Sequence, residues 1–365
     1  MKILFAFNLY YYQSTQLNSS YYFFVDTLKH MGHEVIIIDF GTLNRIGGNT
    51  VVSKTILSTI ATYRPDLFFV VPSRNEIPMY ILNYITKCTK TTTIAWNSDD
   101  DRRWDDYSSK FAFAYDYMLT TYESAAQSAQ KKGLTNILLT QWAANPRFNR
   151  PLNLPKKYDA SFIGMAYDDR PEYIKALIEA GFNIKFGGMN WNKYFENAQT
   201  EFSQEEISII TNQSKISLVF SKGCGSENKQ IKGRVFESPA YQVCTFIEET
   251  PGLDIYFVPG KEVVVFQNKE DLVEKMKYYL THDDHRDTIA RNGYVRVKNE
   301  HTYEKRLKAA FEQINFEKKS DPVLNAVASS IVWALLGTQD IFKRMKTSSL
   351  LCVLMKKSIR KRLLK

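Results

Sequence analysis

The sequence has few cysteines, and their spacing excludes several classes of protein. Only four occur among 365 residues, and no two of them form a C-x-x-C pair. They are Cys88, Cys224, Cys244 and Cys352. Scattered cysteines of this kind argue against a disulfide framework and against a metal cluster, and they favour a reducing compartment.

Motifs that mark common enzyme classes are also absent. No strand-like run is followed by G-x-G-x-x-G, and no G-x-x-x-x-G-K-[ST] occurs, which argues against a nicotinamide dehydrogenase and a P-loop nucleotidase. The absence of G-x-S-x-G leaves a hydrolase nucleophile elbow unsupported. The five histidines form no ligand cluster, since His282 and His285 stand beside acids and are typical of a solvated helix start. We therefore predict no metal site.

Long apolar runs are missing as well. No stretch reaches the roughly 18 apolar residues that a membrane-spanning helix needs. The first residues, MKILFAFN, are typical of a buried strand and lack the cleavage site of a signal peptide. The sequence thus predicts a cytoplasmic protein.

The net charge of +9 is concentrated at one end of the chain. Residues 343–365 contain nine lysines and arginines and no acid, so the preceding 342 residues are neutral overall. Cations mixed with leucines are typical of an amphipathic helix on an anionic membrane surface, and a frayed, solvated tail is the alternative. Nucleic-acid binding is disfavoured because the charge is not spread over a folded face with interleaved aromatic residues.

Strands and helices alternate along the chain. Near-continuous apolar runs such as KILFAFN and HEVIIID are typical of buried parallel strands, and helical patterns follow them. A segment with three prolines, residues 145–159, interrupts the pattern, which restarts at DASFIGMA. We predict an α/β protein with two Rossmann-like domains facing a cleft, followed by a basic helical tail. The expected ranges are 1–150, 151–320 and 321–365.

The stretch KGRVFESPA, residues 232–240, combines two cations with a carboxylate at an expected helix start. Cations and backbone N–H groups at a helix N-terminus suit a diphosphate, and a carboxylate can accept the protons of two ribose hydroxyls. Ser238 and Pro239 fit an N-cap and a first helical position. Glu237 would be favoured near the positive end of the helix dipole in any case, so its spacing leaves a purely structural role equally open.

Residues 232–306 resemble the C-terminal signature of glycosyltransferases with the GT-B fold. The likeness rests on the order Arg-x-Phe-Glu, an apolar strand, a Pro-Gly-x-Glu loop and the run IARNGYVRVKNEHTY. The stretches FIGMAYDDRPEYIKAL, GHEVIIID and IAWNSDDDRRWDDYS resemble other parts of the same family. The family branch that the chain resembles is that of group 1, spore-maturation-protein-like transferases.

This resemblance implies a donor site for a nucleotide-diphosphate sugar and no other cofactor. It implies that Glu237 holds the ribose, that Arg234 lies near the diphosphate, and that Gly164 lets the backbone approach the donor. Arg170 is expected close by. Lys229 stands where the wider superfamily often has a second glutamate, and we include it in the expected donor site.

An acceptor site is expected near three aspartates, Asp99–Asp101, that follow a strand ending at Trp96. A carboxylate there can take the proton of an acceptor hydroxyl, and we expect Asp99 and Asp100 to be the catalytic candidates. The order Asp-x-Asp also resembles a metal motif, but that motif belongs to another glycosyltransferase fold, and the GT-B resemblance implies no metal. The alternative is a hydrated loop paired with neighbouring arginines.

Together these features predict a metal-independent glycosyltransferase that acts at the inner membrane face. It would move a sugar from a nucleotide-diphosphate sugar to a polysaccharide or lipid-linked acceptor. The expected partners are the nucleotide sugar, the glycan or lipid-linked acceptor and, through residues 343–365, an anionic membrane; no nucleic acid is expected. An epimerase-like enzyme on the same fold and a non-catalytic membrane-surface scaffold stay open.

Overall fold

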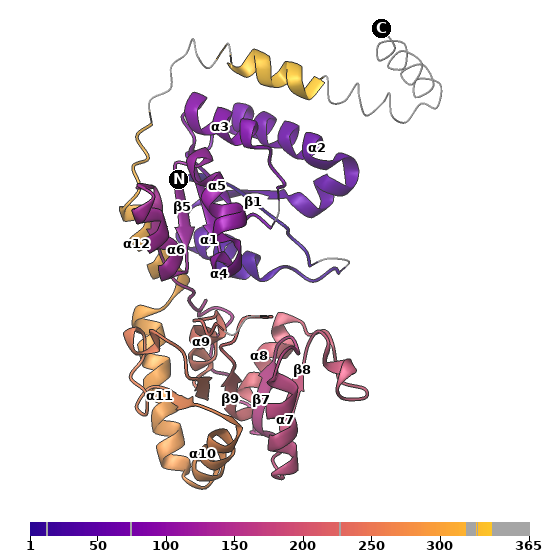
Figure 1. Ribbon diagram of the computed structural model, residues 1–365, viewed down its shortest axis with the longest axis vertical. Coiled ribbons are helices and arrows are strands. Elements are labelled where there is room, and N and C mark those ends of the chain that lie inside the picture. The colour runs from indigo at the N-terminus through magenta and orange to yellow at the C-terminus, as the bar shows by residue number, and fades with distance from the viewer. Residues whose placement is uncertain (12–13, 74, 226–227, 319–325, 327, 338–365) are drawn as a thin grey trace, which may run out of the picture. The chain divides into compact units, whose positions relative to one another are not determined.

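The computed structural model describes residues 1–11, 14–73, 75–225, 228–318, 326 and 328–337 (Figure 1). The chain divides into two compact units. The first consists of Met1–Tyr21, Leu28–Thr140 and the segment that begins at Glu312; the second consists of Tyr22–Thr27 and Gln141–Phe311. The predicted basic segment 343–365 lies outside the described residues.

The first unit is built on a parallel sheet of six strands in the order β2-β1-β3-β4-β5-β6. The strands are β1 (Lys2–Phe7), β2 (Glu34–Asp39), β3 (Leu67–Val70), β4 (Thr92–Asn97), β5 (Tyr117–Thr120) and β6 (Ile137–Leu139). Strand β1 pairs in parallel with both β2 and β3. The strand order therefore reverses beside β1, and in open α/β sheets ligands bind at such a reversal, beyond the carboxyl ends of the strands.

Helices connect these strands and bury the apolar sheet. They are α1 (Asp26–His30), α2 (Phe40–Tyr63), α3 (Met79–Cys88), α4 (Asp100–Arg103), α5 (Ser109–Phe111) and α6 (Glu123–Lys131). Asp39, the last residue of β2, caps α2 by accepting hydrogen bonds from the backbone N–H groups of Gly41 at 3.0 Å and Thr42 at 3.3 Å. The side-chain oxygens thus satisfy donors that a helix leaves unpaired at its start, which fixes where α2 begins.

The second unit has its own parallel sheet, with the order β11-β10-β9-β7-β8. Its strands are β7 (Tyr158–Ile163), β8 (Ile184–Gly187), β9 (Ser214–Val219), β10 (Cys244–Glu248) and β11 (Val264–Phe266). Its helices are α7 (Arg170–Glu179), α8 (Gln204–Asn212), α9 (Arg234–Glu237), α10 (Lys269–Thr281), α11 (Asp283–Glu300) and α12 (Tyr303–Glu312). The Asn268 side chain caps the start of α10 by accepting the Asp271 N–H at 2.9 Å. The predicted α/β class is confirmed in both units.

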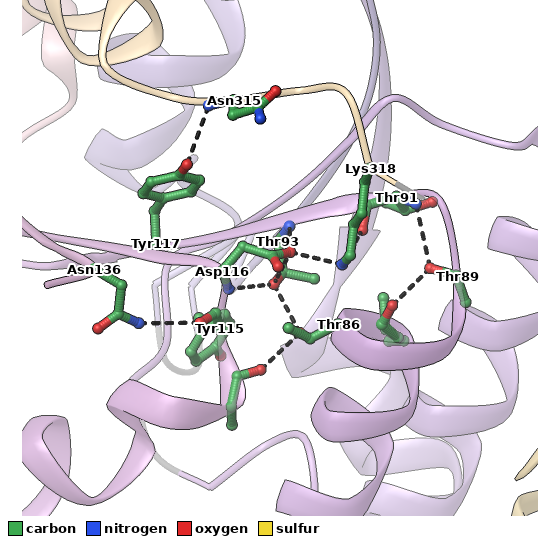
Figure 2. Close-up of polar contacts among 12 residues, drawn as sticks. Thr86, Thr89, Thr91, Thr93, Tyr115, Asp116, Tyr117, Asn136, Asn315 and Lys318 are labelled. Atoms are coloured by element: carbon green, nitrogen blue, oxygen red, sulfur yellow. Dashed lines mark hydrogen bonds and ion pairs between the residues drawn. The ribbon is translucent and has the colours of Figure 1, made fainter. Parts of the chain in front are cut away.

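The segment after α12 is fastened to the sheet of the first unit (Figure 2). Lys318 Nζ donates to Asp116 Oδ2 at 2.8 Å, and the same oxygen accepts the Thr93 backbone N–H at 2.8 Å and its hydroxyl at 3.0 Å. The backbone N–H of Asn315 donates to the hydroxyl of Tyr117 at 3.1 Å. We call Lys318, Asp116 and Thr93 the Lys318 clasp, which joins residues 202 positions apart in sequence.

A further helix, residues 328–337, also packs on the first unit. Its Val332 and Leu336 are 6% and 0% exposed and belong to the same apolar cluster as Ile56 of α2 and Ile81 of α3. In the parts of the chain that the structure describes, this helix included, no helix combines the length and apolarity needed to cross a membrane.

Candidate active site

The donor-site residues predicted from the sequence lie around the carboxyl edge of the second sheet. Strand β7 pairs with β8 on one side and β9 on the other, so the strand order reverses there. The loops that leave β7 and β9 at this edge contain Gly164 and Lys222. This is the position at which an open α/β sheet receives a ligand.

Gly164, directly after β7, has no room for a side chain. A Cβ atom on Gly164 would lie 2.9 Å from the Phe162 ring. Its carbonyl oxygen accepts a hydrogen bond from Trp191 Nε1 at 2.7 Å, and a Cβ atom on Gly188 would lie 2.4 Å from this oxygen. Glycine is therefore needed to bring the backbones after β7 and β8 together. The predicted close approach of a donor to Gly164 stays a prediction.

Arg170 begins α7 and is only 6% exposed. Its guanidinium donates to the carbonyl oxygen of Met165 at 2.9 Å, to that of Phe220 at 3.5 Å and to the hydroxyl of Tyr167. The same group lies 3.7 Å from the centre of the Tyr167 ring. Arg170 thus fastens the loop after β7 to the loop after β9. Its direct contact with a donor stays a prediction.

Four cations follow one another along the segment after β9: Lys222, Lys229, Lys232 and Arg234. They are only partly exposed, with side-chain exposures of 22% for Lys222, 26% for Lys229 and 31% for Arg234. Lys232 Nζ donates to the Tyr167 hydroxyl at 2.8 Å and to the carbonyl oxygen of Lys222. Partly desolvated cations held in fixed positions suit an anionic ligand better than mobile surface lysines do.

Lys229 is held by a carboxylate that the sequence analysis did not single out. Its Nζ lies 3.2 Å from Oε1 of Glu248, which is the last residue of β10 and only 2% exposed. Oε2 of Glu248 accepts the backbone N–H of Ser221 at 2.8 Å. The available signal was an acid at the end of the apolar run CTFIE, on the edge where ligands bind. Glu248 therefore fixes the start of the cationic segment.

The expected N-cap at Ser238 and first position at Pro239 are found, but they open only a three-residue 3-10 turn, Pro239–Tyr241, and the Ser238 side chain makes no capping hydrogen bond. Helix α9 begins at Arg234 after Gly233, and Ser238 is its C-cap, while Pro239 opens a separate 3-10 turn. The Ser238 hydroxyl instead accepts a hydrogen bond from the Ser217 hydroxyl at 3.0 Å. Glu237 consequently lies at the last position of a four-residue helix, and a helix dipole does not explain its place there.

Glu237 is nevertheless buried, with only 6% of its surface exposed. Its Oε2 lies 3.2 Å from Nη1 of Arg234, and a Cβ atom on Gly233 would lie 2.8 Å from its Oε1. Burial raises the pKa of Glu237, and the charge of Arg234 opposes this shift. The structure thus brings Arg234 and Glu237 together as an ion pair next to the cationic segment. Their roles toward a diphosphate and a ribose stay predictions.

The two acceptor-site candidates differ in their surroundings within the first unit. Asp99, after β4, is exposed, whereas Asp100 is 3% exposed. The Ser108 hydroxyl donates to Asp100 Oδ1 at 2.5 Å. Burial raises the pKa of Asp100, and this hydrogen bond opposes the shift. Asp99 can therefore meet a solvent-borne hydroxyl directly, while Asp100 is engaged in holding the following turn.

The alternative for this loop, pairing with arginines, is found only in part. Arg102 Nε lies 3.8 Å from Asp101 Oδ2. Arg103 instead donates to the carbonyl oxygen of Pro72 at 3.3 Å and lies 4.3 Å from the centre of the Tyr107 ring. Arg103 thereby ties the loop after β4 to the loop after β3.

Sequence reasoning also missed a polar pair at the strand reversal of the first unit. Asn8, after β1, donates from Nδ2 to the hydroxyl of Ser73 at 2.9 Å. Both residues follow strands that flank the reversal, which is the signal that could have found them. Among the described residues, no three His, Cys, Asp or Glu side chains are grouped as metal ligands would be.

The family described as "Glycosyl transferase-like" matches residues 170–312, which include Arg170, the cationic segment and Glu237. No curated protein matches the chain in sequence.

Solved structures resemble the chain over most of its length. They include a glycosyltransferase from Rickettsia africae (14% identity, TM-score 0.59, 85% of this chain and 97% of that one) and a sucrose-phosphate synthase from Thermosynechococcus elongatus (10%, 0.58, 86% and 98%). HepE of Anabaena, solved in complex with UDP and glucose, is similar too (9%, 0.58, 86% and 99%). At these identities the likeness establishes the GT-B fold.

Proposed function

Because the chain has the GT-B fold and its residues 170–312 match a glycosyl transferase-like family, we propose that it transfers a sugar from a nucleotide-diphosphate sugar to a hydroxyl acceptor. The observation that carries the proposal is the row of partly buried cations at the carboxyl edge of the second sheet, next to Glu237. The HepE structure with UDP and glucose supports the choice of a sugar nucleotide as donor.

In this proposal the second unit binds the donor. Arg234 and Lys232 face the diphosphate, and the Glu237 carboxylate accepts hydrogen bonds from the ribose hydroxyls. Lys229 and Arg170 hold the surrounding loops, through Glu248 and through backbone carbonyls respectively. Gly164 keeps side-chain atoms away from the donor.

The proposed reaction is a displacement at the anomeric carbon of the donor sugar. The bond from this carbon to the diphosphate oxygen breaks, and its electron pair stays on the oxygen. The acceptor oxygen forms the new bond and loses its proton to a carboxylate, for which Asp99 is the more accessible candidate and Asp100 the positioning one. Fixed cations stabilise the departing diphosphate without a metal ion.

We further propose that the acceptor is a polysaccharide or lipid-linked precursor at the inner membrane face. The nine cations and the apolar residues of 343–365 support this location, because they suit an anionic membrane surface. The protein would then be cytoplasmic and peripheral to the membrane.

Thermal-shift measurements with a panel of nucleotide sugars and free nucleoside diphosphates test the donor site. We expect one class of donor to stabilise the protein. Arg234→Ala should weaken the affinity for this donor on the order of tenfold or more, because a charge-assisted contact to phosphate is lost. Lys175→Ala is the matched control, since Lys175 lies in the same unit with 69% of its side chain exposed. Stabilisation by no donor, or equal loss in both variants, would contradict the proposal.

Turnover distinguishes transfer from other sugar-nucleotide chemistry. Incubation with the bound donor and membrane extracts should produce nucleoside diphosphate and a glycosylated acceptor. If the donor is instead converted to an isomeric sugar nucleotide without any acceptor, the protein is an epimerase-like enzyme and the transfer proposal is wrong.

A further inference from the structure

Helix 328–337 has an unusual composition for the surface of a protein. Its ten residues, ASSIVWALLG, include no charged side chain. Val332 and Leu336 lie on its inner side and are buried in the core of the first unit. A helix at the surface of a globular protein normally carries polar or charged residues on the opposite side.

The outer side of this helix is apolar instead. Ile331 and Leu335 are 56% and 45% exposed, and Trp333, two positions from each and therefore on the opposite flank of the buried side, is 42% exposed. Ile331 and Leu335 are four positions apart, so they lie on one face of the helix. A helix with apolar residues on both sides fits a position between a protein core and a second apolar medium.

The surroundings of the helix combine apolar and cationic groups. Trp333 and Ser329 line a cavity of about 900 Å³ together with residues of α2 and α3. Figure 1 shows helix 328–337, in yellow, beside α2 and α3. Apolar lining comes from Leu57, Ile60, Ala61, Tyr84 and Phe316. Arg64 and Lys90 also line the cavity and are exposed, and two acids, Asp66 and Glu317, share it.

The charge of the neighbouring segment indicates which kind of surface the outer side of the helix binds. The segment 343–365, which begins six residues after Gly337, carries nine cations and no acid. An anionic surface would attract this segment strongly, and tryptophan is favoured at the boundary between headgroups and acyl chains. A protein partner would be expected to offer hydrogen-bonding groups to a polar rim, and the outer side of this helix has only serine for them.

We propose that helix 328–337 docks on an anionic lipid bilayer, with Ile331 and Leu335 inserted among the acyl chains and Trp333, on the other flank, at their boundary with the headgroups. Arg64 and Lys90 lie toward the lipid headgroups. This surface belongs to the first unit and goes beyond the proposed attraction by the basic segment, because it adds an apolar anchor at a defined place in the fold. It does not depend on which sugar is transferred.

Vesicle flotation of the full chain tests the proposal, with phosphatidylcholine alone and mixed with phosphatidylglycerol. The partition coefficient of the variant Ile331→Ser/Trp333→Ser into mixed vesicles should be lower by on the order of tenfold or more. The reason is that the apolar area of the two side chains is no longer removed from water on binding. The control Ile46→Ser/Phe113→Ser removes residues of the same kinds, 69% and 61% exposed in the first unit, and should bind like the wild type.

A second measurement locates the tryptophan directly. Phospholipids with brominated acyl chains should quench the indole fluorescence of the wild type, and this quenching should fall in Trp333→Phe. If the double variant melts early, Ile331→Ser alone should still reduce partitioning several-fold.

Three results would overturn the proposal. The first is equal vesicle binding by the helix variant and the wild type, and the second is quenching unchanged by Trp333→Phe. The third is a change from dimer to monomer in light scattering of the helix variant with vesicle binding unaltered, which would assign the surface to a second copy of the chain. Donor-induced thermal shifts should be the same in all these variants, so a failure here is distinct from a failure of the proposed transferase function.

Discussion

Replacing Lys318 by methionine should loosen the attachment of residues 312–318 to the first sheet. The substitution keeps the apolar stem and removes the charge that lies 2.8 Å from Asp116 Oδ2. Asp116 would keep its two hydrogen bonds from Thr93 but would lose its cation, while only 22% of its side chain is exposed. The carboxylate would then be partly desolvated without a compensating charge.

The expected size of this effect follows from the burial of the pair. A hydrogen bond to a charged group contributes about 1.5–3 kcal/mol. Because both side chains keep some contact with water, 16% for Lys318 and 22% for Asp116, we expect about 1–2 kcal/mol. Since about 1.4 kcal/mol corresponds to a factor of ten, the exchange rate of the Thr93 amide should rise roughly 5- to 30-fold.

Hydrogen–deuterium exchange measured by mass spectrometry gives the required local readout, on peptides that contain Thr93 and Asn315. Lys132→Met is the matched control, because Lys132 pairs with Asp105 at 3.4 Å with side chains that are 50% and 84% exposed. Such a pair contributes at most about 1 kcal/mol and should change exchange little. If Lys318→Met leaves both peptides as protected as in the wild type, the clasp does not fasten the segment.

Three further results are expected. Burial raises the pKa of Glu237 in the folded chain above its unfolded value. The free energy of unfolding should therefore fall as the pH rises from the ordinary glutamate range through the raised pKa. Thermal melts across that pH range should show a smaller fall for Glu237→Gln than for the wild type. Gly188→Ala should lower the free energy of unfolding by at least about 2 kcal/mol, because its φ is +122° and the new Cβ would lie 2.4 Å from the Gly164 carbonyl oxygen. Gly32→Ala should cost about half as much, because its φ is also positive, at +83°, but no atom lies within 4 Å of the new Cβ. Lys229→Met should destabilise by about 2 kcal/mol because it leaves the buried Glu248 without its cation, and an unchanged melting temperature would contradict this.

The strands could be predicted because their signal is local. Runs such as KILFAF and EVIIID became β1 and β2, and the restart at DASFI became β7, since the strands of a parallel sheet covered by helices are mostly apolar at consecutive positions. The N-cap of α10 was predictable for the same reason, because Asn268 and Asp271 are neighbours on the chain.

What could not be predicted depends on residues that are distant in sequence. Helix α9, which ends with Glu237, begins at Arg234 and buries Val235 and Phe236 in the core, while Pro239 opens only a separate 3-10 turn. Glu248 holds Ser221, 27 positions away, and no spacing rule relates them. No pattern in the sequence indicates that Lys318 contacts Asp116. The sequence therefore predicted a domain boundary near residue 320, whereas the segment that begins at Glu312 already belongs to the first compact unit.

The fastening of the chain's late residues to its first unit also bears on synthesis by the ribosome. The strands β1 to β6 leave the exit tunnel early, but Lys318, Val332 and Leu336 emerge only after the whole second unit has been made. During that interval the nascent first sheet lacks the cation that pairs with Asp116, and part of its apolar surface is exposed to water. Such exposed surface is a binding site for chaperones. Emergence of residues 312–337 from the tunnel would be the event that completes the first unit.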